Sequence, residues 1–341
     1  MQASYKKHLL QFKVPAHTSR GSYNEKVMYL LTLSNGSHVA VAEAAPLPDL
    51  SIDSMPKMEE KMLEVCTYLN EQNDILEIYD VLQLQHFPSI QFALECAFEK
   101  LKYKEPYLLF HSAFTEKKEG IPINGLVWMA SKENMWQQIE QKIEAGYTCI
   151  KLKIGALDFD EECRLLEQVR KKYSAHKITL RVDANGAFTI DDAKQKLNDL
   201  ATFELHSIEQ PIKSNQHDAM QQLCAETKLP IALDEELIGA NVIGTSEKLL
   251  NYIRPQFIVL KPTLLGGFKN CNRLIDTASK NNIGWWITSA LESNIGLNAI
   301  AQYCGTLKFS MPQGLGTGAL YVNNFEEYLT VKKGILYFDK N

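Results

Sequence analysis

Charged residues recur at a nearly constant interval through the middle of this 341-residue chain. Each closes a short apolar run, and successive members lie 25 to 30 residues apart. The series comprises Lys151 with Lys153, Asp183, Glu209, Asp234 and Lys261. An interval of this size accommodates one β-strand, one α-helix and two loops. The spacing therefore predicts repeated β/α units whose strands end in charged side chains.

From Ile121 onward the sequence alternates between apolar runs and amphipathic segments. Helices are expected, for example, over residues 160–173 and 190–201. The expected strands lie near residues 121–126, 148–153, 178–183, 205–210, 230–235, 256–261, 284–289 and 307–312. Eight strands with seven intervening helical segments predict a (β/α)8 barrel of TIM type. Because the carboxyl ends of barrel strands meet on one rim, the charged residues are expected to converge on a single active site.

An open, doubly wound sheet is the alternative α/β architecture. It would call for a glycine-rich turn after its first strand, and this sequence has none there. The glycines of Gly314-x-Gly316-x-Gly318 follow the last expected strand. We interpret them as a flexible loop rather than a phosphate site, since isolated glycine repeats are weak motifs.

The first hundred or so residues do not show the 25- to 30-residue interval of the barrel and predict a separate α+β domain over residues 1–110. Two β-rich runs, 27–33 and 38–44, flank Asn35-Gly36, which is a hairpin signal. Helices are expected over about 54–69 and again after Pro88, with Ser89 as the N-cap.

The remainder of the chain divides into two further parts. The barrel is expected to occupy residues 120–315. Residues 316–341 regain β character at 328–331 and 335–338. This C-terminal segment is expected to pack back on the N-terminal domain by pairing with its strands.

Composition excludes several classes of function. The net charge is −5, from 36 basic and 41 acidic residues without a basic block, so nucleic acid is not an expected partner. No apolar stretch approaches about 18 residues, which argues against a transmembrane helix. The amino terminus lacks the pattern of a secretion signal, and seven scattered cysteines favour a reducing cytoplasm. The sequence does not decide whether the chain forms a homo-oligomer.

Three successive strand ends carry the carboxylates Asp183, Glu209 and Asp234. Without a counter-charge they would repel one another and raise each other's pKa, and a hard divalent cation removes that conflict. Three protein oxygens, with other positions left to water and substrate, are typical of Mg²⁺, and the lack of His there argues against zinc or iron. A salt bridge is the alternative for any single acidic strand end. Three in register favour a metal site.

Lysines flank these carboxylates. Lys151 and Lys153 are two residues apart on one strand and therefore point the same way. Near a metal, each is expected to lower the other's pKa until one can act as a base. Lys261 is expected across the barrel mouth. The arrangement suits proton removal beside a substrate carboxylate, with the metal stabilising the enediolate. A solvated strand end is the alternative for the lysine pair. Asn185 is expected to orient substrate or a metal-bound water, with a loop or cap role as the alternative.

Five motifs together resemble the enolase superfamily, muconate-lactonizing subgroup. They are Lys151-x-Lys153, Arg181-Val182-Asp183-Ala184-Asn185-Gly186, Ile208-Glu209-Gln210-Pro211, Leu233-Asp234-Glu235 and Lys261-Pro262-x-x-x-Gly266-Gly267. The pairing of a lysine base with magnesium is a known property of that superfamily. The resemblance implies that residues 1–110 are an α+β capping domain. The Glu43-Ala44-Ala45-Pro46-Leu47-Pro48 segment is similar to the loop that such enzymes fold over the substrate.

Within the subgroup, the chain most resembles the o-succinylbenzoate synthase family of menaquinone biosynthesis. The cues are Pro46-Leu47-Pro48, Ile121-Pro122-Ile123-Asn124-Gly125-Leu126 and Ser289-Ala290-Leu291-Glu292-Ser293. The resemblance implies a dehydration of a succinylated hydroxycyclohexadiene carboxylate.

The same resemblance implies a role for each site residue. Lys153 would remove the proton and then protonate the departing hydroxide, Lys261 would face the ring as a cation–π partner, and Lys151 would tune Lys153. Ser289 and Ser293 would reach substrate carboxylate oxygens, with a helix cap as the alternative for a serine at a strand end.

Other activities stay open. An N-acylamino-acid racemase, a dipeptide epimerase or a cycloisomerase of the same subgroup would use the same framework. Residues 309–324 contain no Asp or Glu, which weighs against a cationic substrate end but not against an N-acylated amino acid. A Schiff-base aldolase would not need three carboxylates, and a binding module without activity would not need the complete set.

Overall fold

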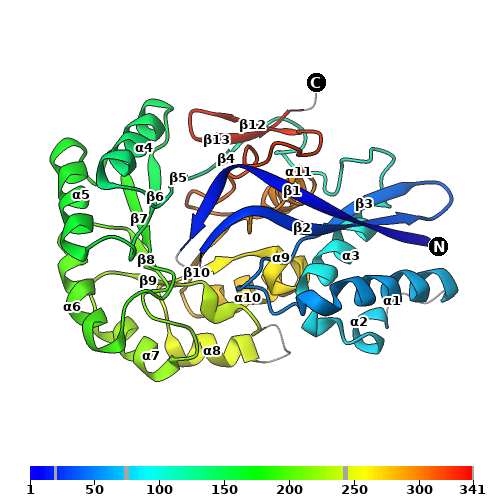
Figure 1. Ribbon diagram of the computed structural model, residues 1–341, viewed down its shortest axis with the longest axis horizontal. Coiled ribbons are helices and arrows are strands. Elements are labelled where there is room, and N and C mark those ends of the chain that lie inside the picture. The colour runs from blue at the N-terminus through cyan, green and yellow to red at the C-terminus, as the bar shows by residue number, and fades with distance from the viewer. Residues whose placement is uncertain (19–20, 73–76, 241–244, 340–341) are drawn as a thin grey trace.

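A curved parallel sheet of seven strands forms the centre of the molecule (Figure 1). The computed structural model describes residues 1–18, 21–72, 77–240 and 245–339. Strands that follow one another in sequence are neighbours in this sheet, and every pair is parallel. The strands are β5 (Gly125–Val127), β6 (Cys149–Lys153), β7 (Thr179–Asp183), β8 (Ser207–Glu209), β9 (Ile231–Leu233), β10 (Phe257–Leu260) and β11 (Gly284–Ile287).

The eighth strand, expected over 307–312, does not form. The gap between β11 and the start of the sheet is closed instead by Gln313 and Gly314, which make single parallel bridges to Ile123 and Thr288. Pro312 has no backbone N–H to add to a ladder, and a Cβ atom on Gly314 would overlap the Thr288 side chain. The segment interpreted as a flexible loop therefore completes the barrel.

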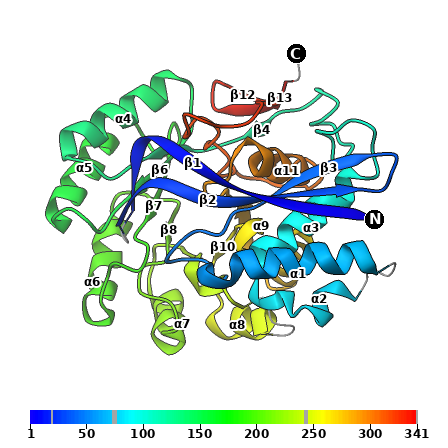
Figure 2. The same cartoon turned by 45° about the vertical axis from the view of Figure 1, so that its right-hand side comes forward.

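Helices follow the strands and lie around the outside of the sheet (Figures 1 and 2). They are α4 (Lys132–Glu144), α5 (Phe159–Lys172), α6 (Ile190–Ala201), α7 (His217–Glu226), α8 (Thr245–Ile253), α9 (Pro262–Leu265), α10 (Phe268–Lys280) and α11 (Asn294–Cys304). The helices predicted over 160–173 and 190–201 are confirmed by α5 and α6. Within the described part of the chain, no helix is both long and apolar enough to cross a bilayer.

Strand β6 shows how one strand serves both the core and the site. Side chains alternate between the two faces of a strand. Ile150 and Leu152 are fully buried and belong to the main hydrophobic core. Lys151 and Lys153 point to the other side, into the barrel interior.

The N-terminal part is an antiparallel sheet with helices packed beside it. The sheet order is β1-β2-β3, and the hairpin predicted at Asn35-Gly36 is confirmed, with the Asn35 side chain accepting hydrogen bonds from the backbone of Ser37 and His38. The elements are β1 (Gln2–Thr18), β2 (Gly21–Ser34), β3 (Val39–Ala44), the 3₁₀ turns Met55–Lys57 and Leu84–His86, α1 (Met58–Glu71), α2 (Ile78–Val81) and α3 (Pro88–Lys100).

The start of α3 differs from the prediction. Pro88 is its first residue and Phe87 its N-cap, so Ser89 is not the cap. The backbone N–H and hydroxyl of Ser89 both donate to Oδ1 of Asp53, at 3.1 and 2.6 Å. Proline favours the first helical position because its missing N–H would have no partner there, which moves the helix start one residue earlier.

The C-terminal strands exist as predicted but pair differently. The hairpin of β12 (Leu329–Lys332) and β13 (Ile335–Phe338) joins β4 (Ile121–Pro122) rather than the N-terminal sheet. The segment before this hairpin meets β1 instead: Lys13 N donates to Leu320 O at 2.8 Å, and Gln11 N donates to Asn323 Oδ1 at 2.8 Å. The division at residues 1–110, 120–315 and 316–341 stays a prediction.

Candidate active site

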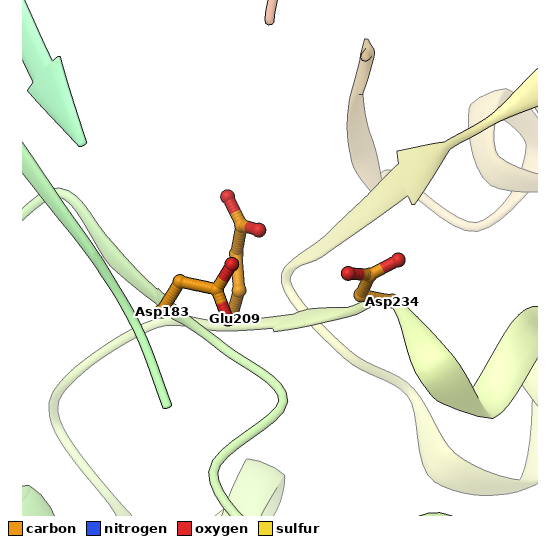
Figure 3. A group of neighbouring side chains, drawn as sticks. All are labelled: Asp183, Glu209 and Asp234. Atoms are coloured by element: carbon orange, nitrogen blue, oxygen red, sulfur yellow. The ribbon is translucent and has the colours of Figure 1, made fainter. Parts of the chain in front are cut away.

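Three buried carboxylates meet at the carboxyl ends of neighbouring strands, as the spacing predicts. Asp183 closes β7, Glu209 closes β8 and Asp234 directly follows β9. Asp183 lies in register with Glu209, and Glu209 with Ala232 of β9. One oxygen from each carboxylate lies within 4.8 Å of the others. Figure 3 shows the three side chains arranged around one common space.

These residues fit a divalent cation. Oε1 of Glu209 and Oδ1 of Asp234 are buried and have no hydrogen-bond partner among the described residues. A buried carboxylate oxygen without a partner is unfavourable, and a metal ion removes the penalty. Because the group offers only carboxylate oxygens, a hard ion such as Mg²⁺ is the suitable class of ligand.

Lysine ammonium groups stand on two sides of the carboxylates. Nζ of Lys153 lies 2.6 Å from Asp183 Oδ2 and 2.7 Å from Asn185 Oδ1. Nζ of Lys261 lies 2.6 Å from Asp234 Oδ2. Since Lys153 ends β6 and Lys261 follows β10, three strands separate them along the barrel.

The second lysine of β6 lies deeper than the first. Nζ of Lys151 is 2.8 Å from Asp183 Oδ2 and also contacts Glu209. Burial disfavours this ammonium group, but the surrounding carboxylates outweigh burial and raise the pKa of Lys151. The carboxylates therefore act on Lys151 more strongly than burial does, and the lowering of lysine pKa expected beside a metal stays a prediction.

The carboxylates respond to burial and to the lysines in different ways. Burial opposes the ionisation of Asp183, yet two adjoining ammonium groups hold its pKa below the usual range. Burial raises the pKa of Glu209 to about 7, and the Asp183 carboxylate adds to the effect. Burial also raises the pKa of Asp234. Asp183 is thus held ionised by the lysines, whereas burial disfavours ionisation of Glu209 and Asp234, an effect that a bound divalent cation would oppose.

A cavity with about 730 Å³ of empty space, open solvent at its mouth included, lies beside these groups. Its polar lining includes Lys153, Asn185 and Lys261, together with Ser289, whose hydroxyl lies 2.6 Å from that of Thr317. The structure therefore brings the proposed lysines, Asn185 and Ser289 to one pocket. The apolar wall is formed by Leu47, Leu50, Leu126, Trp128, Ala290 and Leu291.

Ser293 is not part of this lining. Its hydroxyl is fully buried, accepts the N–H of Ile295 at 3.2 Å and donates to Glu43. The helix-cap alternative therefore describes Ser293, and its assignment to substrate is wrong. Glu43 likewise faces α11, while Leu47 of the same segment and Leu50 just after it reach the pocket.

Gln210 supports the site but was given no role on sequence grounds. Its Oε1 accepts the backbone N–H groups of Asp234 and Glu236 at 3.2 Å each. Its Nε2 donates to Ile212 O and to Glu236 Oε2, both at 3.0 Å. Gln210 therefore links the end of β8 to the backbone of Asp234, which directly follows β9. Its place directly after Glu209 is the signal that could have identified it.

Comparison with known proteins identifies the family. Residues 134–339, more than half of the chain, match the family described as enolase C-terminal domain-like. The chain belongs to the enolase superfamily.

Individual relatives extend over nearly the whole chain. An o-succinylbenzoate synthase from Desulfotalea psychrophila is 43% identical, with 98% of each chain covered. The crystal structure of MenC from the same organism superposes with a TM-score of 0.91 at 40% identity, covering 99% of both chains. A dipeptide epimerase from Cytophaga hutchinsonii, complexed with Mg and a dipeptide, has a TM-score of 0.82 at 20% identity, covering 98% of this chain and 92% of its own. This last similarity concerns the fold alone.

Proposed function

We propose that this protein is a magnesium-dependent o-succinylbenzoate synthase. It would remove water from 2-succinyl-6-hydroxy-2,4-cyclohexadiene-1-carboxylate, through an enediolate, in menaquinone biosynthesis. The observation that carries the proposal is the 43% identity to an o-succinylbenzoate synthase over 98% of the chain. The three clustered carboxylates with lysines on two sides support the chemistry.

Lys153 is the proposed acid and base. It takes the proton from the ring carbon that bears the carboxylate, and the C–H electron pair moves into the enediolate. As its conjugate acid, Lys153 then gives that proton to the departing hydroxyl on the same face, so that the C–O bond breaks and water leaves. Asp183 and Asn185, which both bond its ammonium group, orient it for the two steps.

Lys261 and Lys151 have supporting roles in this proposal. Lys261 faces the opposite side of the ring, where its positive charge stabilises the electron-rich intermediate. Lys151 shares Asp183 with Lys153 and thereby tunes it. Asp183, Glu209 and Asp234 would hold Mg²⁺, which stabilises the negative charge that develops on the substrate carboxylate.

The pocket supports a small, largely apolar carboxylate as substrate. Leu47, Leu50 and Trp128 offer a wall against which the ring and the methylene groups of a succinyl chain can pack. Ser289 and Asn185 add polar contacts to the lining of the cavity. The wall also excludes water from the proton transfer.

The direct test is turnover of the cyclohexadiene carboxylate, followed by ultraviolet absorbance with magnesium and with a chelator. We expect dehydration that depends on magnesium. Absence of turnover with magnesium present would reject the proposal. Turnover that survives chelation, together with an adduct trapped by borohydride, would favour a Schiff-base aldolase mechanism.

N-acylamino-acid racemisation is the second candidate. The placement of Lys153 and Lys261 on two sides of the carboxylates is what a two-base reaction requires. Assaying N-succinylamino acids under the same conditions separates the activities. A kcat/KM for racemisation above that for dehydration would replace the first proposal with the second.

A further inference from the structure

Helix α10 begins without a side-chain cap of its own. Its N-cap residue is Gly267, which has no side chain to accept the free N–H groups of the first turn. Glu95 of α3 supplies the missing acceptor. Its Oε2 receives the N–H of Phe268 at 2.5 Å and that of Lys269 at 3.3 Å, and the side chain is buried.

The two glycines before α10 permit this contact. Gly266 and Gly267 have φ values of 82° and 97°, a region that favours glycine. A Cβ atom on Gly267 would overlap the Glu95 carboxylate, and one on Gly266 would overlap the Gln91 side chain. The Gly266-Gly267 pair therefore allows α3 to approach the barrel closely (Figure 2).

Only the single turn of α9 and the Gly266-Gly267 pair separate the capped N–H groups from Lys261. Backbone hydrogen bonds span this segment: Leu265 N donates to Lys261 O at 3.0 Å, and Gly267 N donates to Pro262 O at 2.8 Å. All four residues of α9 are buried. These bonds and the burial of α9 link the Glu95 contact to the backbone of Lys261.

Further contacts hold the same turn from both sides. On the α3 side, the ring of Phe92 meets that of Phe268 edge-on, with centroids 5.4 Å apart. On the barrel side, the Thr263 hydroxyl donates to Glu292 Oε1 at 2.5 Å. Lys261 thus sits on a short segment clamped between the N-terminal part and the barrel.

We propose that Glu95 is a positioning residue for Lys261, which it acts on by capping α10 from the N-terminal part of the chain. It fixes α9 and so keeps the Lys261 ammonium group on the side of the pocket away from Lys153. The inference deepens the proposed function and rests on it for the role of Lys261. It also gives the N-terminal part a task beyond shaping the substrate pocket.

The test compares Glu95→Ala and Glu95→Gln with Thr189→Ala. Thr189 is the matched control because its exposed side chain caps α6, another barrel helix, and does not line the pocket. We expect Glu95→Ala to lower kcat by about 100-fold, since small displacements of a catalytic group have effects of that size. Glu95→Gln should stay near wild type because its amide oxygen accepts the same N–H groups. Thr189→Ala should change Tm by a few degrees but not kcat.

A kcat for Glu95→Ala equal to that of Thr189→Ala would overturn the proposal. If Glu95→Ala does not fold, Glu95→Asp, whose carboxylate is withdrawn by one methylene, takes its place with the same two outcomes. A crystal structure of the variant gives an independent readout. We expect Lys261 Nζ to leave its position 2.6 Å from Asp234 Oδ2, and an unchanged position would contradict the proposal.

These outcomes separate the inference from the proposed function. Wild-type protein without dehydratase activity would reject the proposed function alone. The position of Lys261 in the variant crystal structure would then decide whether Glu95 positions it.

Discussion

The two ends of one barrel hold buried charge in different ways. At the carboxyl ends of the strands, carboxylates and lysines meet beside an open cavity. Toward the amino ends, the buried Arg181 guanidinium lies over the Trp286 ring, with 4.1 Å to its centroid, and Nη1 donates to Pro312 O at 2.9 Å. Nε and Nη2 of Arg181 have no hydrogen-bond partner among the described residues, so the face of the ring takes that role.

Aromatic groups enclose the Arg181 end. The His206 ring lies 4.8 Å from that of Phe257, which in turn lies 5.6 Å from Trp286. Burial, with a contribution from Arg181, lowers the pKa of His206 to about 4, so it is neutral at pH 7. The comparison teaches that a buried charge marks a reactive site only where space is left for a ligand. Arg181 and Asp183 are two residues apart on β7 and serve these opposite purposes.

The largest effect should come from Lys153→Ala at the open end. Removing the proposed acid and base should lower kcat by about 10²- to 10⁴-fold, because no other group replaces the proton transfer. Steady-state kinetics measure kcat, and thermal melting checks that the fold is retained. Near-normal turnover would show that Lys153 is not the acid and base of the reaction.

Asp234→Asn should affect metal binding and activity together. The substitution removes a ligand charge, so we expect the affinity for Mg²⁺ to fall by at least about tenfold, with kcat/KM falling in parallel. Calorimetric titration with Mg²⁺ measures the affinity. Glu226→Gln is the control, since Glu226 pairs with Lys194 on the exposed face of the barrel helices. Equal Mg²⁺ affinities for the two variants would show that Asp234 is not a metal ligand.

Trp286→Ala tests the enclosed end. Deleting a buried tryptophan should lower the free energy of unfolding by about 3–5 kcal/mol, and here it also uncovers the Arg181 charge. We expect kcat of the folded protein to change by less than about tenfold, because this ring does not line the pocket. Chemical denaturation and kinetics measure the two quantities. A large loss of kcat without loss of stability would contradict the claim that this end of the barrel serves stability rather than catalysis.

Glu95→Gln should alter the pH dependence of stability. Burial raises the pKa of Glu95 to about 7 from an ordinary value of 4.5, while its backbone hydrogen bonds oppose the rise. Stability associated with the protonated carboxyl is present below about pH 4.5 and is lost as pH rises to about 7. Relative to Glu95→Gln, the wild-type free energy of unfolding should therefore fall over this range, by up to about 3 kcal/mol. If the free energies of unfolding of the two proteins varied with pH in parallel, the raised pKa of Glu95 would be contradicted.

The convergence of Asp183, Glu209 and Asp234 could be predicted because it follows from one rule. Parallel strands joined by helices bring their carboxyl ends together, so a regular interval in the sequence becomes proximity in space. The same rule places Lys153 and Lys261 at the pocket. The helices α5 and α6 followed from the local periodicity of their apolar residues.

What could not be predicted depends on contacts between distant residues. Ser293 is held by Glu43, 250 residues earlier in the chain, which no local pattern reveals. The eighth barrel position is closed by the bridges of Gln313 and Gly314 to two other segments rather than by a strand. The raised pKa of Lys151 depends on carboxylates that only the folded barrel brings close.

The central claim is that carboxylates from three neighbouring strands bind one cation between the two lysine sides of the pocket. A crystal structure with magnesium and the cyclohexadiene carboxylate tests it most directly. We predict a single ion bound by Asp183, Glu209 and Asp234, with Lys153 and Lys261 on opposite faces of the substrate ring. An ion bound elsewhere, or both lysines on one face, would contradict the account.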